Sequence, residues 1–131
     1  MRINQVLAAK AIQKVITVSP DATVREMLEM LAEHNVGALV VSSDGKGLDG
    51  IVSERDVVRR LTGNENLLEA SVSSIMTTDV EICHGDHPVN DLMQVMTEKR
   101  IRHVPVMDGD EIVGVISIGD VVKNRMQELE F

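Results

Sequence analysis

The sequence predicts an α/β (α+β) fold that consists of two tandem β-α-β-β-α repeats. Residues 50–56 (GIVSERD) return 64 positions later as residues 114–120 (GVISIGD), and both copies read Gly, two β-branched residues, Ser, two variable residues and Asp. An apolar pattern typical of a helix at residues 24–31 also returns, 65 positions later, and so does a strand-like pattern at residues 36–41. The Gly-Ser-Asp segment is typical of a turn. A repeated unit that ends in this turn indicates two equivalent ligand sites.

The length of 131 residues fits one compact domain or two very small ones. We expect the first repeat at residues 8–63 and the second at residues 72–129, joined by residues 64–74. Each repeat alone is near the lower size limit for independent folding. We therefore expect the two repeats to share a core and to pack as one pseudo-two-fold module.

The best-defined element of the first repeat is a helix expected at residues 23–34, where apolar residues recur at i, i+3, i+4 and i+7. Thr23 is its expected N-cap, with Glu26 as the capping-box partner. Asn35 and Gly37 mark its end. The other elements of this repeat are expected as strands at 15–18, 38–41 and 48–52 and a helix at 54–61.

The second repeat follows the same order. Its elements are expected as strands at 80–83, 103–107 and 111–116 and helices at 89–100 and 118–129. Residues 3–11 are expected to form a short amphipathic helix ahead of the first repeat. Residues 72–76 take the equivalent place ahead of the second repeat.

The composition limits the classes of function. The net charge of −8 argues against non-specific nucleic-acid binding, which depends on neutralising phosphates. The single cysteine, Cys83, excludes an internal disulfide and fits a reducing compartment. No signal peptide and no apolar stretch of about 20 residues is visible, so we expect a cytoplasmic protein without a membrane partner. Because Phe131 is the only aromatic residue, a planar ligand would have to lie between aliphatic side chains.

The repeated unit, ending in Gly, two hydrophobic residues and Ser-x-x-Asp, resembles the CBS domain, and two units in tandem resemble one CBS pair, or Bateman module. Two further segments fit this family: residues 75–77 (IMT), and residues 103–106 (HVPV). The first repeat departs from both, with residues 10–12 (KAI) and 38–41 (ALVV) at the matching places. The resemblance covers essentially the whole chain.

The Ser-x-x-Asp segments have two interpretations. In the first, Ser53 and Asp56 form a capping box at the start of a helix, with no further role. In the second, the N–H groups and dipole of that helix N-terminus bind a phosphate, and Gly50 allows close backbone approach. The resemblance implies that the Asp takes the ribose hydroxyls and that the Ser lies near the phosphate. The same two interpretations apply to Ser117 and Asp120.

The resemblance also implies two clefts, each combining the Ser-Asp turn of one repeat with the first and buried strands of the other. The main nucleotide-binding cleft is expected to contain Ser53, Arg55, Asp56, Thr78, Val80, Ile101, Arg102 and His103. The second nucleotide-binding cleft is expected to contain Gln13, Val15, Val36, Gly37, Ala38, Ser117 and Asp120.

The two clefts are expected to differ in charge. Arg55, Arg102 and His103 would serve a phosphate in the main cleft, whereas the second cleft has no cation at the matching positions. Since a polyanionic ligand needs charge-assisted hydrogen bonds, we expect the Asp56 cleft to be the main site. The second cleft would stay empty or hold an adenosine moiety weakly. The alternative for Arg55 and Arg102 is an ordinary solvated surface charge.

We expect neither a metal site nor a catalytic site. Residues 83–87 (CHGDH) contain ligand types, but residues 18–22 (VSPDA) match them as an ordinary loop, and no second ligand cluster completes a zinc motif. No base is visible for Ser53 or Ser117, and Cys83 lies in no nucleophile motif. No phosphate-binding loop motif or dinucleotide fingerprint is present. The chain is therefore not expected to be an enzyme or to carry a catalytic cofactor.

For function, the resemblance implies a regulatory sensor that binds AMP, ADP, ATP, NAD(H) or S-adenosylmethionine and acts on a separate, unidentified effector protein. It also implies a homodimer built on the helices near residues 54–62 and 119–129. The alternative is a protein–protein interaction module whose clefts bind no ligand. An enzyme is a third hypothesis, which the missing catalytic residues disfavour.

Overall fold

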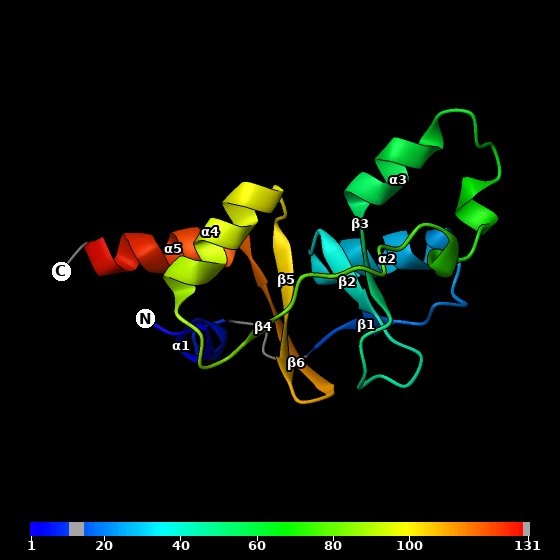
Figure 1. Cartoon of the computed structure of the whole chain (residues 1–131). Coiled ribbons are helices and arrows are strands. Elements are labelled where there is room, and N and C mark those ends of the chain that lie inside the picture. The colour runs from blue at the N-terminus through cyan, green and yellow to red at the C-terminus, as the bar shows by residue number, and fades with distance from the viewer. Residues whose placement is uncertain (11–14, 130–131) are drawn as a thin grey trace. The chain divides into compact units, whose positions relative to one another are not determined.

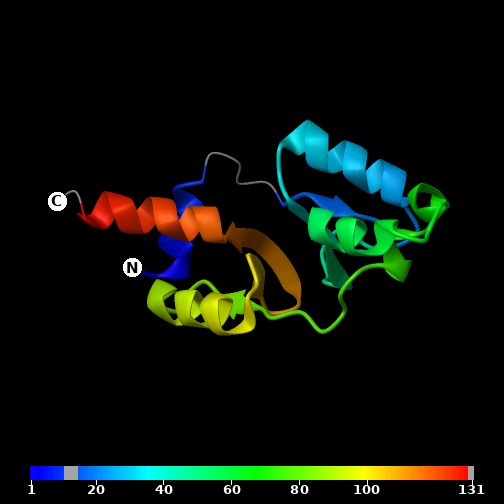
Figure 2. The same cartoon turned by 90° about the horizontal axis from the view of Figure 1, so that it is seen from above.

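The structure, a computed structural model that describes residues 1–10 and 15–129, divides into two compact units. One unit is Ile16–Val80, and the other combines Met1–Val15 with Glu81–Phe131. Each unit contains one three-stranded sheet and its own helices (Figure 1, Figure 2). The predicted α/β class, with the β-α-β-β-α order given twice, is confirmed.

The sheet of the Ile16–Val80 unit contains strands β1 (Thr17–Val18), β2 (Ala38–Val41) and β3 (Gly50–Ser53), in that order. β1 runs parallel to β2, and β2 runs antiparallel to β3. The central strand β2 is buried at three of its four positions, as its unbroken apolar sequence indicates.

Helix α2 (Val24–His34) begins and ends where the sequence indicates. The Thr23 side chain accepts a hydrogen bond from the Glu26 N–H over 3.1 Å, which makes Thr23 the N-cap. Asn35 adopts a left-handed φ of 53° and ends the helix; Asn is one of the few residues that tolerate this conformation. Helix α3 (Glu54–Leu61) follows β3 directly, without an intervening loop.

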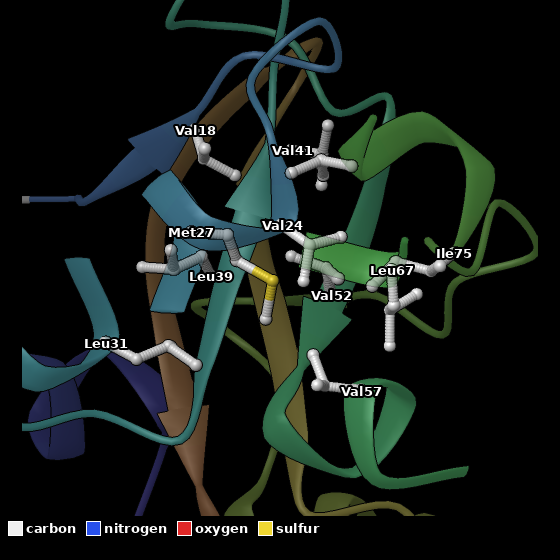
Figure 3. Close-up of a cluster of buried hydrophobic side chains, with 11 residues drawn as sticks. Val18, Val24, Met27, Leu31, Leu39, Val41, Val52, Val57, Leu67 and Ile75 are labelled. Carbon is white, nitrogen blue, oxygen red and sulfur yellow. The ribbon is translucent and has the colours of Figure 1, made fainter. Parts of the chain in front are cut away.

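Figure 3 shows the apolar core of this unit, built by α2, α3, the sheet and residues of the segment after α3. That segment contains two short 3-10 turns, η1 (Leu67–Glu69) and η2 (Val72–Ser74). Of the predicted helical stripe, Val24, Met27 and Leu31 are buried, whereas Leu28 is only partly buried. The other buried members of the core are Val18, Leu39, Val41, Val52, Val57, Leu67, Val72 and Ile75.

The other unit repeats this topology with β4 (Cys83–His84), β5 (His103–Asp108) and β6 (Glu111–Ser117). Helices α4 (Val89–Lys99) and α5 (Ile118–Leu129) lie side by side in this unit (Figure 2). Its buried core consists of Ile3, Val6, Cys83, Val89, Leu92, Met96, Val104, Val106, Ile116 and Val121.

The helix ahead of the first repeat, α1 (Ile3–Ala8), belongs to the unit of the second repeat. Ile3 and Val6 are almost completely buried in that unit's core. The backbone is tied to the same unit, because the Ile3 N–H donates to the His87 carbonyl (3.0 Å) and the Asn4 N–H donates to the Gly85 carbonyl (2.8 Å).

The equivalent segment ahead of the second repeat packs into the unit of the first repeat. The Val72 N–H donates to the Ala22 carbonyl over 2.8 Å, and Ile51 and Thr77 exchange two backbone hydrogen bonds of 2.9 Å. Each core is therefore completed by the segment that leads into the other repeat. This exchange gives each small repeat apolar surface to bury that it does not contain itself.

The two glycines of the repeated motif make room for these segments. A Cβ at Gly50 would lie 2.7 Å from the Thr77 carbonyl oxygen, and a Cβ at Gly114 would lie 2.6 Å from Cδ2 of Leu7. The close backbone approach predicted at Gly50 is thus made by the protein itself. The repetition of the glycine follows from packing.

The first strand of each repeat is shorter than the apolar pattern predicts. The strands expected at 15–18 and 80–83 are observed as Thr17–Val18 and Cys83–His84, so Val15 and Val80 lie outside the ladders. Each of these strands makes only two pairs with its parallel neighbour. An apolar pattern shows which residues can be buried, but not where the partner strand offers hydrogen-bonding groups. Residue 11 of the helix expected at 3–11 lies outside the described residues.

No helix in residues 1–10 and 15–129 combines the length and apolar character that a membrane-spanning helix requires.

Candidate functional site

The first Ser-x-x-Asp segment joins β3 to α3 in a closed hydrogen-bonded turn. The Ser53 hydroxyl oxygen accepts from the Asp56 N–H (3.3 Å), while Oδ2 of Asp56 accepts from the Ser53 N–H (2.8 Å) and the Ser53 hydroxyl (3.1 Å). This is the predicted capping box. Since a carboxylate has about four acceptor positions on two oxygens, capping leaves acceptor capacity for a ligand hydroxyl.

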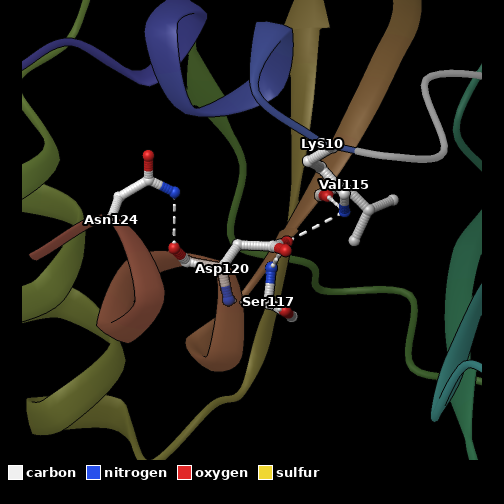
Figure 4. Close-up of polar contacts among 5 residues, drawn as sticks. All are labelled: Lys10, Val115, Ser117, Asp120 and Asn124. Atoms are coloured by element: carbon white, nitrogen blue, oxygen red, sulfur yellow. Dashed lines mark hydrogen bonds and ion pairs between the residues drawn. The ribbon is translucent and has the colours of Figure 1, made fainter. Parts of the chain in front are cut away.

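The second Ser-x-x-Asp segment has the same geometry between β6 and α5 (Figure 4). The Asp120 N–H donates to the Ser117 hydroxyl oxygen (3.1 Å), and the Ser117 N–H donates to Oδ2 of Asp120 (2.9 Å). Asn124, one turn further along α5, donates to the Asp120 carbonyl (2.8 Å). The two turns are therefore equivalent in backbone and capping, as the repeat predicts.

The two turns differ in their cations. The Lys10 ammonium lies 2.8 Å from Oδ2 of Asp120 and donates to the Val115 carbonyl over 2.7 Å (Figure 4). No ion pair of Asp56 is found among the described residues. The second cleft was expected to have no cation at the positions that match Arg55, Arg102 and His103, and Lys10 occupies none of these positions. It reaches the Asp120 turn from the segment that follows α1, a cation that this comparison of positions missed. The sequence signal was the departure of residues 10–12 from residues 75–77.

Lys10 changes the acidity of Asp120. Burial of the carboxyl favours its neutral form, but the hydrogen bonds from Lys10 and the Ser117 N–H, together with the Lys10 charge, outweigh burial and lower the pKa of Asp120. The carboxylate is therefore fully ionised at neutral pH. The side chains of Lys10 and Asp120 are 25% and 22% exposed, so the pair lies at the surface within reach of a ligand.

Backbone hydrogen bonds place the start of each buried strand beside the Ser-Asp turn of the same unit. The Glu54 N–H donates to the Gly37 carbonyl (3.1 Å), and the Ile118 N–H donates to the Arg102 carbonyl (2.8 Å). In register, Ala38 lies opposite Ser53 and His103 lies opposite Ser117.

The other residues of the two predicted clefts vary in exposure. Arg55, Thr78 and Arg102 are exposed. Those of intermediate burial are Val15, Val36, Gly37, Ala38, Val80, Ile101 and His103. Gln13 lies outside the described residues. The grouping of residues from both repeats into a main and a second cleft stays a prediction.

A pocket of about 650 Å³ lies elsewhere, in the unit of the second repeat. Its lining comes from α1, the turn after β4 and the β5–β6 hairpin, and contains none of the residues predicted for the two clefts. Within the described residues, no group of three or more His, Cys, Asp or Glu is arranged to hold a metal ion.

The cysteine in this unit is buried and is expected to react slowly. Cys83 is buried, its thiol points to the Pro105 carbonyl at 3.6 Å, and burial raises its pKa to about 11. Because the thiolate is the reactive form, we expect 5,5′-dithiobis(2-nitrobenzoate) at pH 8 to label the folded protein at least about 100-fold more slowly than the urea-unfolded protein. Equal labelling rates, followed at 412 nm, would show an accessible thiol.

The CBS domain family model matches residues 8–63 and residues 72–126, one match for each repeat. The chain belongs to the CBS domain family. The CBS-domain protein ATU1752 from Agrobacterium tumefaciens is 39% identical, with a TM-score of 0.89 over 95% of this chain and 99% of that one. The CBS domain-containing protein YhcV of Bacillus subtilis is 33% identical over 86% of this chain and 80% of its own.

A third CBS relative was solved with a ligand. The CBS domain protein PAE2072 from Pyrobaculum aerophilum, complexed with AMP, is 28% identical to this chain. Its TM-score is 0.83, and the match covers 99% of this chain and 97% of that one.

Proposed function

We propose that this CBS pair binds an adenine nucleotide at its Ser-Asp turns and thereby regulates a separate effector protein. The observation that carries the proposal is the presence of two equivalent turns, each with an Asp carboxylate and a Ser hydroxyl at the start of a helix. The carboxylate suits the ribose hydroxyls, since it accepts charge-assisted hydrogen bonds. The helix N-terminus suits a phosphate.

The turn at Ser53 and Asp56 is proposed as the main site. Arg55 lies inside this turn and is exposed, so its guanidinium is available to a phosphate. The Asp56 carboxylate has no ion-pair partner among the described residues, whereas Asp120 already binds Lys10. The remaining residues proposed for the main site are Thr78, Val80, Ile101, Arg102 and His103.

The proposed ligand class is an adenine nucleotide, with AMP as the first candidate. The support is the relative PAE2072, which was solved with AMP. This chain has no Trp or Tyr and a single Phe, so the adenine would lie between aliphatic side chains. ADP, ATP, NAD(H) and S-adenosylmethionine are the other candidates within the same class.

We also propose that two copies of the chain associate through α3 and α5. Val58 and Leu61 on α3 are 69% and 57% exposed, and Val122, Met126 and Leu129 on α5 are 47%, 60% and 74% exposed. On α5 these residues recur at helical spacing and form an apolar stripe. A homodimer would cover this stripe. The same surface favours the second candidate function, an interaction module that binds a partner protein without a ligand.

A thermal shift assay tests the nucleotide proposal. Dialysed protein is heated with AMP, ADP, ATP, NAD, NADH or S-adenosylmethionine. A ligand present at about 100 times its dissociation constant adds about 2.7 kcal/mol of stability, so one of them is expected to raise the unfolding midpoint clearly. If none raises it, the nucleotide proposal is wrong and the interaction module becomes the better account.

A further inference from the structure

We propose that Lys10 determines the ligand class of the second turn: it makes the Asp120 turn select a phosphorylated adenine ligand over the uncharged nucleoside. This inference rests on the proposed function, because it concerns the ligand of one of the two proposed turns. It differs from the expectation that the second cleft, with no cation at the matching positions, would stay empty or hold an adenosine moiety weakly.

The structure fixes the ammonium of Lys10 at the turn. The ammonium donates both to Oδ2 of Asp120 and to the Val115 carbonyl of β6, at 2.8 and 2.7 Å. The backbone before it is held as well, because the Lys10 N–H donates to the Leu7 carbonyl (3.2 Å) and Ile3 and Val6 anchor α1 in the core. The side chain is therefore positioned before a ligand arrives and loses less entropy on binding.

The charge of the turn decides what it accepts. With Lys10, the Lys10–Asp120 pair has no net charge, and a phosphate at the start of α5 meets an ammonium beside the carboxylate. Without Lys10, the only charge of the pair is that of Asp120, which repels a phosphate. At a partly exposed site such a charge changes the affinity for a nearby anion about tenfold, and it leaves an uncharged ligand nearly unaffected.

The capping geometry separates this role from a structural one. Ser117 and Asp120 make the same capping hydrogen bonds as Ser53 and Asp56, which pair with no lysine of residues 1–10 and 15–129. Lys10 is therefore not required to form a Ser-Asp turn. Its distinct contribution is the positive charge, and the test must compare a charged with an uncharged ligand.

The test uses isothermal titration calorimetry of the full chain with AMP and with adenosine. Asp56→Ala removes the carboxylate of the main turn and serves as the background. Lys10→Met, Lys10→Gln or Lys10→Arg is then combined with it as a second substitution. Both neutral variants are expected to lower the affinity for AMP about tenfold and to leave that for adenosine within about twofold, while Lys10→Arg keeps the preference for AMP. Lys46→Met, which removes an exposed lysine of the other unit, is expected to change neither affinity.

Several outcomes would overturn the inference. Equal changes for AMP and adenosine, unchanged AMP binding in both neutral variants, or stronger binding of both ligands would each show that Lys10 does not select for phosphate. Lys10→Gln keeps a donor for the Val115 carbonyl, so it covers the case in which Lys10→Met does not fold. AMP binding that vanishes with Asp56→Ala alone would show that the Asp120 turn is not a site. If the unmutated chain binds neither ligand, the proposed function itself fails.

Discussion

Asp56→Ala is expected to weaken AMP binding about tenfold or more, whereas Asp120→Ala weakens it about threefold or less. A hydrogen bond to a charged group contributes about 1.5–3 kcal/mol. The Asp56 carboxylate is available to accept such a bond from a ribose hydroxyl. Asp120 contributes less, because its carboxylate also binds Lys10 at 2.8 Å. Isothermal titration calorimetry of the two single variants measures the difference.

The shared capping geometry supplies the control for this comparison. Each Asp accepts the N–H of the Ser three residues before it, over 2.8 and 2.9 Å. Losing this capping contact costs about 1 kcal/mol of stability in either unit, so this loss is common to both variants. Asp120→Ala also breaks the ion pair with Lys10, and its smaller expected effect on AMP binding therefore does not arise from a smaller loss of stability. Equal losses of AMP affinity, or a larger loss at Asp120, would contradict the ranking of the two turns.

Ile3→Ala is expected to lower the free energy of unfolding by about 2–5 kcal/mol, the usual cost of emptying a buried Ile site. Ile3 is completely buried although it is only the third residue of the chain. It belongs to the core formed by the second repeat, with Val89 and Ile116 among its members. Urea denaturation followed by circular dichroism measures the change.

Ile82→Ala is the matched control, because it removes the same atoms from a side chain that is 44% exposed. It is expected to cost less than about 1 kcal/mol. If Ile3→Ala lowers the free energy of unfolding as little as this control does, α1 contributes little to the core. The packing of α1 into the unit of the second repeat would then not stabilise the protein.

Local signals in the sequence were enough to predict most elements. Thr23 and Asn35 mark the two ends of α2 because capping and the left-handed conformation depend only on neighbouring residues. The repeat then predicted the same elements in the second half, and α4 ends in the same way, at Arg100 with a φ of 55°. Gly50 and the Ser-Asp turns were found because each recurs in an equivalent place.

Contacts between segments far apart in the chain could not be predicted in this way. Lys10 reaches Asp120 across 110 residues. Residues 10–12 depart from residues 75–77, but nothing in the sequence identifies Asp120 as the partner of Lys10. Two further contacts also join segments that are far apart in the chain. Ile3 is buried with the second repeat, and the Thr77 carbonyl lies so close to residue 50 that only Gly fits there. The apolar side chain of Val80 predicts a strand position, but no strand in the described part of the chain pairs with it.

A crystal structure of this chain grown with AMP tests the central claim most directly. The proposal predicts AMP with its ribose hydroxyls within hydrogen-bond distance of the Asp56 carboxylate and its phosphate near Ser53 and Arg55. AMP bound without contact to either Asp56 or Asp120 would contradict the assignment of the Ser-Asp turns as nucleotide sites.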